Sequence, residues 1–117
     1  MDIRLQEERY EIDGKTYVLR CNMAVIADVQ EAFGGSIAEA TGDRASLRSK
    51  LTFLAAMIND YADEQGWEER YSWRQLGRRV RPGDAVLAQV GRLVVAEMYR
   101  PKDATEPEAA GAENAKN

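Results

Sequence analysis

The side chains of this chain that could carry out chemistry are few, and their types exclude most catalytic machinery. The 117 residues include no histidine and one cysteine, Cys21. The sequence therefore excludes Ser-His-Asp and Cys-His nucleophile systems, His-ligated zinc sites and HExxH proteases. A single cysteine forms no internal disulfide, which favours a reducing compartment. We expect Cys21 to be a small, buried apolar residue.

Two short motifs resemble ligand sites, and each has a simpler structural interpretation. Asp60, Asp63 and Glu64 have the i, i+3, i+4 spacing that lets carboxylates share a hard cation. No further oxygen-ligand motif accompanies them, which favours a solvated helix face. The Gly-Gly-Ser run at 34–36 lacks the pattern of a phosphate-binding loop and follows an expected helix, which favours a helix C-cap. We therefore expect no metal, no cofactor and no enzymatic activity.

Large aromatic side chains gather around one expected loop, at Tyr61, Trp67, Tyr71 and Trp73. Aromatic residues bury readily, and half or more of these four could simply cover the core. Tyr and Trp are also enriched among the residues that dominate binding at protein interfaces. Both interpretations stay open, and these four residues form the candidate partner-binding site.

One basic segment raises the alternative of DNA binding. Arg74, Arg78, Arg79 and Arg81 lie near the junction of two expected helices that loosely resemble a helix-turn-helix. However, residues 86–88 are apolar where a DNA reader needs polar side chains, and the net charge is -4. Because counterion release needs clustered positive charge, we expect no nucleic-acid partner. The arginines are instead expected to pair with acidic residues.

Length and composition limit the architecture that positions these residues. With 44% hydrophobic and 31% charged residues, the chain fits one globular domain, which we place at residues 1–100. Residues 101–117 contain no Leu, Ile, Val or aromatic residue, so we expect a disordered acidic tail. No apolar signal segment begins the chain, and no apolar run approaches the roughly 18 residues of a membrane span. We therefore expect a soluble cytoplasmic domain without a membrane partner.

The first 21 residues predict a β-hairpin. Asp13-Gly14 separates two alternating segments, 9–12 and 16–19, and this dipeptide favours a two-residue turn because the turn needs positive φ. The register pairs Tyr10 with Tyr17 and gives one apolar face, which consists of Tyr10, Ile12, Tyr17 and Leu19. Ile3 and Leu5 leave a third strand open.

Apolar residues at helical spacing, with caps at both ends, predict about four helices behind the hairpin. The expected helical segments are 22–33, a short turn at 37–40, 47–64, 73–80 and 82–99. The main inward stripes are Leu47, Leu51, Leu54, Ala55, Ile58 and Ala62 in the longest helix, and Val86, Leu87, Val90, Leu93, Val94 and Met98 in the last. The broad apolar arc of the longest helix predicts a central position. The expected fold class is α+β, with the hairpin packed on the helical bundle.

The order of these features resembles the tail assembly chaperones of long-tailed phages and prophages. In that family, a hairpin of the type x-(hydrophobic)-x-D-G-K-x-Y-x-L leads into a helix closing with E-x-x-(F/Y)-G-x-S-(I/L). Ile12–Tyr17 and Glu31–Ile37 match these motifs. A later pattern, (T/S)-x-x-x-(L/V)-G-x-x-(hydrophobic)-x-P-G-(D/N), is matched by Ser72–Asp84. The resemblance covers about residues 9–99 and departs from the family at Trp67–Arg74.

The resemblance implies a protein that binds the tape measure protein and keeps it soluble in the host bacterial cytoplasm during tail assembly. Such a protein is not an enzyme and is absent from the finished particle. If Trp67 or Trp73 is an anchor for the partner, its change to Ala should weaken binding while leaving the fold intact. Two other classes stay open: a structural tail or head–tail connector component that self-associates, and a prophage DNA-binding regulator that uses Arg74–Arg81.

Overall fold

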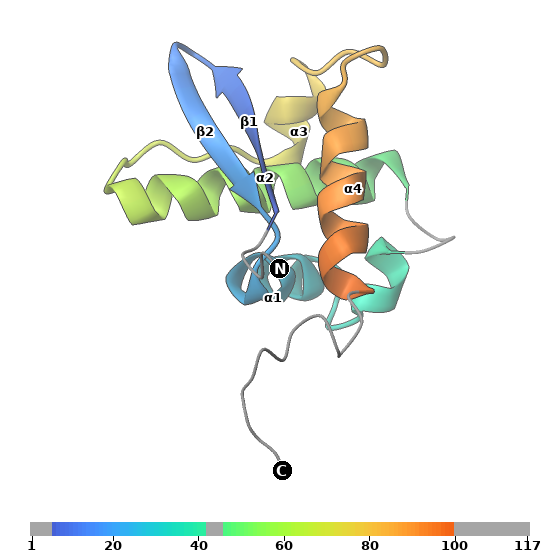
Figure 1. Ribbon diagram of the computed structural model, residues 1–117. Helices are drawn as coiled ribbons and strands as arrows, with labels where there is room; N and C mark the ends of the chain where they lie inside the picture. Colours follow the sequence, from blue (N-terminus) through green and yellow to red (C-terminus); the bar gives the residue numbers. More distant parts are fainter. Residues whose placement is uncertain (1–5, 42–45, 100–117) are drawn as a thin grey trace.

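A two-stranded antiparallel sheet at the start of the chain stands against a set of helices (Figure 1). The structure is a computed structural model that describes residues 6–41 and 46–99. The elements in chain order are β1 Glu7–Ile12, β2 Lys15–Arg20, α1 Met23–Ala32, the 3-10 helix η1 Ile37–Ala40, α2 Leu47–Gln65, α3 Trp73–Gly77 and α4 Val86–Met98. The expected α+β class is confirmed. The expected tail at 101–117 and the third strand at Ile3 and Leu5 lie outside the described residues.

The hairpin has the expected register. Asp13 and Gly14 both have positive φ, 53° and 78°, which suits a turn whose twist matches that of the two strands. Tyr10 pairs with Tyr17. On the face shared by these residues, the side chains of Ile12, Tyr17 and Leu19 are buried. The buried face lies toward the helices, and β2 contacts α2.

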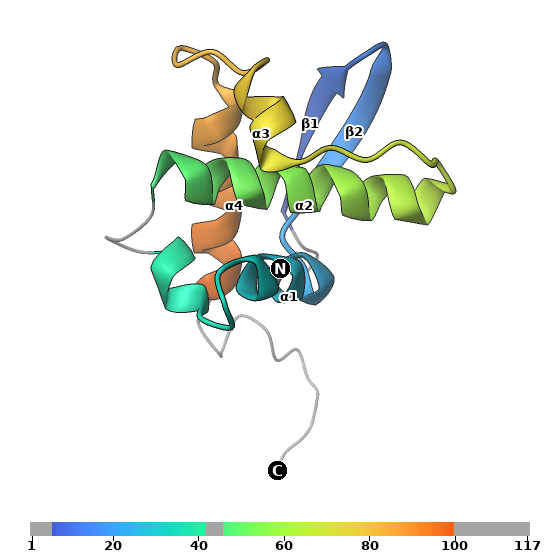
Figure 2. The same cartoon turned by 180° about the vertical axis from the view of Figure 1, so that it is seen from behind.

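Helix α2 is the centre of the fold. It contacts β2, α1, α3 and α4, and Figure 2, which shows the molecule from behind, has α2 crossing in front of the hairpin with α1 below and α3 above. Ser46 accepts a hydrogen bond from the Ser49 amide at one end, and Gly66 ends the helix in the left-handed conformation. The expected stripe is buried from Leu51 onward. Leu47 is a correction: it is 63% exposed, because it is the first residue of α2 and the buried residue of that turn is Ser49.

Helix α1 begins after the expected cap, Asn22, and ends at Ala32, one residue before the expected Phe33. The Asn22 side chain accepts from the Val25 amide at 2.9 Å and caps the N-terminus. At the other end, the Gly35 amide donates to the Gln30 carbonyl at 2.8 Å, and both Gly34 and Gly35 have positive φ. The interpretation of the glycine pair as a C-cap is confirmed.

The segment between α3 and α4 differs from the expected one. Helix α3 ends at Gly77 and not at the expected Val80, and α4 begins at Val86 and not at the expected Pro82. The Asp84 amide donates to the Arg81 carbonyl at 2.9 Å, and the Arg81 amide donates to the Asp84 carboxylate at 3.0 Å. Pro82, whose φ is fixed near that of a turn's second residue, therefore forms a turn rather than the first turn of a helix.

Cys21 lies at the end of the hairpin and is buried, as expected. Burial, followed by the charge of Glu97, raises the pKa of its thiol to about 12. The thiol is therefore protonated at neutral pH and packs as a small apolar group. Across residues 6–41 and 46–99, no helix has the length and apolar character that crossing a membrane requires.

Candidate partner-binding surface

Three of the four candidate aromatic residues belong to one cluster built around Tyr17. Ring centroids of Tyr61, Trp67 and Tyr71 lie 6.1, 5.3 and 6.4 Å from that of Tyr17, all in edge-to-face geometry. Tyr61 and Trp67 also meet each other at 5.7 Å. Because edge-to-face pairs suit the charge distribution of aromatic rings, this cluster holds β2 against the end of α2 and the loop that follows it.

Tyr71 is held on every side. Asn59 accepts from its amide at 2.9 Å and donates to its carbonyl at 2.8 Å. The Tyr71 hydroxyl donates to Asp13 at 2.5 Å, and Arg79 donates to the same carboxylate at 2.6 Å. These two donors, Tyr71 first, hold the pKa of the Asp13 carboxyl below its ordinary value. Burial and the Asp13 carboxylate together raise the pKa of Tyr71.

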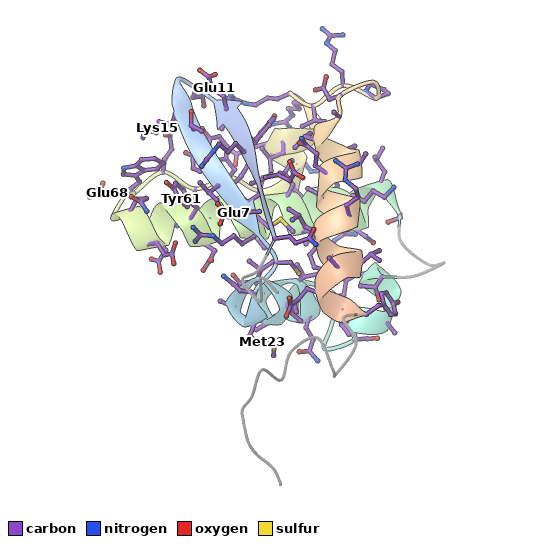
Figure 3. The ribbon with its side chains drawn as sticks, viewed as in Figure 1. Glu7, Glu11, Lys15, Met23, Tyr61 and Glu68 are labelled. Carbon is purple, nitrogen blue, oxygen red and sulfur yellow. The ribbon has the colours of Figure 1, made fainter. Side chains whose placement is uncertain are left out.

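Trp67 is half-buried, and a charged side chain covers part of it. The Lys15 ammonium lies 5.0 Å from the centre of the Trp67 ring, a cation–π distance, and it also reaches Glu69 at 3.4 Å. Lys15 and Tyr61 lie on the same side of the hairpin, next to the C-terminal end of α2 (Figure 3). The indole therefore has contacts within the domain on more than one side.

Trp73 lies apart from this cluster, at the first residue of α3. The Arg48 and Arg74 guanidinium carbons lie 5.0 and 4.8 Å from the centre of the Trp73 ring, and Arg48 also approaches the Phe33 ring at 5.9 Å. The structure thus brings together three of the four candidate residues and places the fourth at a separate, half-buried position between two cations.

The arginines of the basic segment do not form one surface, since two of them contact different partners within the domain. Arg79 binds Asp13 and Arg74 stacks on Trp73. A helix-turn-helix needs two helices joined by a turn of about three or four residues. Here α3 has five residues, and residues 78–85 separate it from α4. The geometry gives no support to a recognition helix at this place.

The carboxylates of Asp60, Asp63 and Glu64, whose spacing could suit a shared cation, each contact a different side chain. Asp60 accepts from Asn22 at 2.8 Å. Asp63 meets Arg70 at 3.3 Å, and Glu64 meets Arg20 at 3.2 Å. Within the described part of the chain, no group of three or more acidic or cysteine side chains could hold a metal ion.

The structure shows a groove beside α4 in the described residues. It encloses about 750 Å³ and lies between α4, the start of α2 and the end of η1. We call it the α4 groove, and the apolar side chains that define it are Ala40, Phe53, Leu87, Val90, Val94 and Val95. Figure 1 shows α4 upright beside the hairpin, and none of the four candidate aromatic residues lines the α4 groove.

Two large apolar side chains at the α4 groove remain open to solvent. Val95 is 56% exposed and Tyr99, which also lines the groove, is 60% exposed. In the same groove, Val90 and Val94 are buried. The α4 groove thus has a fixed apolar floor and an exposed apolar rim, which is the composition of a surface that binds an apolar partner.

The charges around the α4 groove are positive. Lys50 and Arg92 line it, and neither has an acidic partner among residues 6–41 and 46–99. Both side chains belong to exposed residues. This local charge is opposite in sign to the net charge of -4 of the whole chain.

Sequence reasoning missed the α4 groove. It assigned α4 one inward stripe and left Val95 and Tyr99 without a role. A usable indication was present, since the run Leu93-Val94-Val95 makes the apolar arc of α4 wider than the contacts of one stripe require. What the sequence did not show is that η1 and the start of α2 leave part of this arc uncovered.

Comparison with known proteins adds no family to this description: no protein-family model matches the chain, and searches of the curated proteins and of the solved structures gave no match. The fold and the α4 groove therefore define the class, a small α+β domain with an exposed apolar groove.

Proposed function

We propose that this protein is a tail assembly chaperone of a long-tailed phage or prophage. In this proposal it binds the tape measure protein in the host cytoplasm and keeps it soluble, without catalysing a reaction. The observation that carries the proposal is the α4 groove, an exposed apolar surface on a chain with a net charge of -4. The charge keeps a complex soluble while the groove binds apolar segments.

The dimensions of the α4 groove suit a helical partner. Helix α4 has 13 residues and forms one wall. At a rise of about 1.5 Å per residue it offers roughly 20 Å, which is three to four turns of a helix laid beside it. An amphipathic helix docks in such a groove through apolar residues at i, i+3, i+4 and i+7. A tape measure protein, long and helical, has many such stripes that must stay covered before the tail forms.

The motifs behind the family resemblance have clear structural positions, and this supports the proposal. Asp13-Gly14 forms the hairpin tip, and Gly34-Gly35 ends α1. The Ser72–Asp84 motif contains the capping box of α3 and the Arg81–Asp84 turn. Because these residues set where elements begin and end, chains that share them would be expected to share this arrangement of elements.

The test is co-expression with the tape measure protein encoded beside it. We expect the tape measure protein to be soluble and to co-purify with the wild-type chain. Val95→Asp places a charge on the groove rim and should abolish co-purification. Leu47→Asp is the matched control, because Leu47 is comparably exposed at 63% but does not line the groove.

A tape measure protein that is equally soluble alone, with no complex recovered, would contradict the proposed function. Rings of the purified chain in electron micrographs would favour a connector component instead. Trp73 stays a predicted second anchor, since it is half-buried with Arg48 and Arg74 beside it. Trp73→Ala should then weaken the complex by about 2 kcal/mol or more without loss of the fold.

A further inference from the structure

We infer that the α4 groove selects amphipathic helices whose apolar stripe is flanked by acidic residues. This inference rests on the proposed function only for the kind of partner, a helix. It concerns which helices bind, and it follows from the charges of the groove itself.

The first step is the sign of the charge at the groove. Lys50 comes from the first turns of α2 and Arg92 from the middle of α4, so the two cations belong to two different walls. Among the described residues that line the α4 groove there is no Asp or Glu. A helix lying in the groove therefore meets positive charge on two walls.

The second step is that these cations are available. Elsewhere in the described chain, arginine and lysine side chains beside the hairpin pair with carboxylates, as Arg20 does with Glu7 at 3.1 Å and Arg79 with Asp13 at 2.6 Å. Lys50 and Arg92 have no such partner within the described ranges. A carboxylate on a docked helix would supply one without breaking an existing pair.

The two cations would make the α4 groove selective for acidic over basic flanking residues. Interface charges contribute more to the choice of partner than to affinity, because a like charge at the same position is repelled. The chain as a whole is negative and would repel an acidic peptide at long range. A preference for acidic flanks would therefore have to arise locally, at Lys50 and Arg92.

The experiment uses two fluorescently labelled peptides of about 18 residues, long enough to lie along α4. Both contain the same Leu and Ala stripe, flanked by Glu in one peptide and by Lys in the other. Binding to the full chain is followed by fluorescence polarisation. We expect the Glu-flanked peptide to bind about tenfold more tightly.

Two variants locate that preference. The double variant Lys50→Glu, Arg92→Glu should reverse it. Arg9→Glu, Arg78→Glu is the matched control, because it changes the net charge equally at two exposed residues that do not line the groove. The control should retain the preference of the wild type. A preference that survives in the first variant, or that is lost equally in the control, overturns the inference.

A third variant fills the α4 groove without weakening the fold. Gly91 lines the groove within α4, and a Cβ added there meets no atom within 4 Å. Gly91→Leu should therefore place a side chain in the groove, and replacing a helix-interior glycine favours the helix. We expect both peptides to bind at least tenfold more weakly, about one order in Kd, at equal or higher thermal stability. Unchanged peptide affinity would overturn the inference.

The outcome can be separated from that of the proposed function. If the tape measure protein co-purifies equally with the wild type and with Lys50→Glu, Arg92→Glu, the chaperone proposal stands and this inference fails. If the peptides show the expected preference but no tape measure protein is recovered, the inference stands and the chaperone proposal fails. A wild-type dimer that Gly91→Leu converts to monomer would make a second copy the occupant and overturn the inference.

Discussion

The hairpin tip and the α4 groove use the same kinds of residue in opposite ways. At the tip, aromatic and charged side chains are bound within the domain: Tyr71 and Arg79 both donate to Asp13, and Lys15 covers Trp67. At the rim of the α4 groove, Val95 and Tyr99 are exposed, and Lys50 and Arg92 have no acidic partner among the described residues. The four aromatic residues looked like a binding surface in the sequence, yet most of their ring area serves the fold. The exposed apolar side chains Val95 and Tyr99 line the α4 groove, which includes none of the four.

The aromatic residue types in this chain do not by themselves indicate a binding site, because three of the four pack on Tyr17. A Trp or Tyr whose ring already packs within the domain has little surface left for a partner. Tyr71 is 6% exposed, and its hydroxyl donates a hydrogen bond to Asp13. Val95, in contrast, is 56% exposed. The contacts around Asp13 and Tyr71 hold the domain together, and the exposed rim of the α4 groove is the surface to which the proposed function assigns the partner.

The largest effect should come from the core that both regions share. Leu54 is fully buried on α2, and Leu54→Ala should lower the free energy of unfolding by about 2–5 kcal/mol, because a cavity remains. Leu47→Ala, on the exposed first turn of the same helix, should change it by less than about 0.5 kcal/mol. Urea unfolding of the two variants measures both values. Equal losses would show that the exposed end of α2 is packed after all.

Within the aromatic cluster, Tyr17→Phe should stabilise the protein. The Tyr17 ring is buried among three other rings, but its hydroxyl has no hydrogen-bond partner among the described residues. Removing an unpaired buried hydroxyl should raise the free energy of unfolding by about 1 kcal/mol. Tyr71→Phe, which loses the bond to Asp13, should lower it. Thermal denaturation of the two variants tests the contrast, and a destabilised Tyr17→Phe would contradict it.

The hairpin and the helix ends could be predicted because their determinants are local. Asp13-Gly14 sets the register by turn geometry, and Ser46 and Gly66 bound α2 by hydrogen bonding and by positive φ. The start of α4 could not be predicted from the sequence, because Pro82 suits both a helix N-terminus and a turn. The Arg81–Asp84 hydrogen bonds select the turn.

The candidate site was harder to predict because exposure depends on contacts between distant segments. Val94 and Val95 are identical neighbours in the sequence, yet one is 7% and the other 56% exposed. The difference follows from where α2 and η1 lie against α4. In the same way, only the folded chain shows that Asp13 and Tyr71 meet, which makes the tip structural.

The Asp13 carboxylate gives the hairpin tip a pH dependence, of smaller size because this side chain is 38% exposed and screened by solvent. Its ordinary pKa is 3.8, and its pKa in the folded chain is lower. Its contribution to stability is therefore present above pH 3.8 and lost as pH falls through the lower, folded value. Asp13→Asn keeps a residue that tolerates the φ of 53° but removes the charge.

We expect Asp13→Asn to be less stable than the wild type near neutral pH, with the difference narrowing as pH falls below about 3.8. Urea midpoints across that range measure it. Glu11→Gln on the same hairpin is the control for loss of an exposed carboxylate (Figure 3). A difference between wild type and Asp13→Asn that stays constant with pH would mean that the carboxylate charge contributes nothing to the tip.

The smallest effect on stability should come from a substitution at the groove rim. This small effect would distinguish the rim from the core. Val95→Ser should change the free energy of unfolding by less than about 0.5 kcal/mol, since Val and Ser have similar helix propensities and the side chain is 56% exposed. Val94→Ser, one residue earlier and 7% exposed, should cost clearly more. Urea unfolding measures both. If Val95→Ser also weakens tape measure binding, a residue that does little for the fold would be contributing mainly to the complex. A loss of stability equal to that of Val94→Ser would instead assign Val95 to the core and remove the rim from the groove.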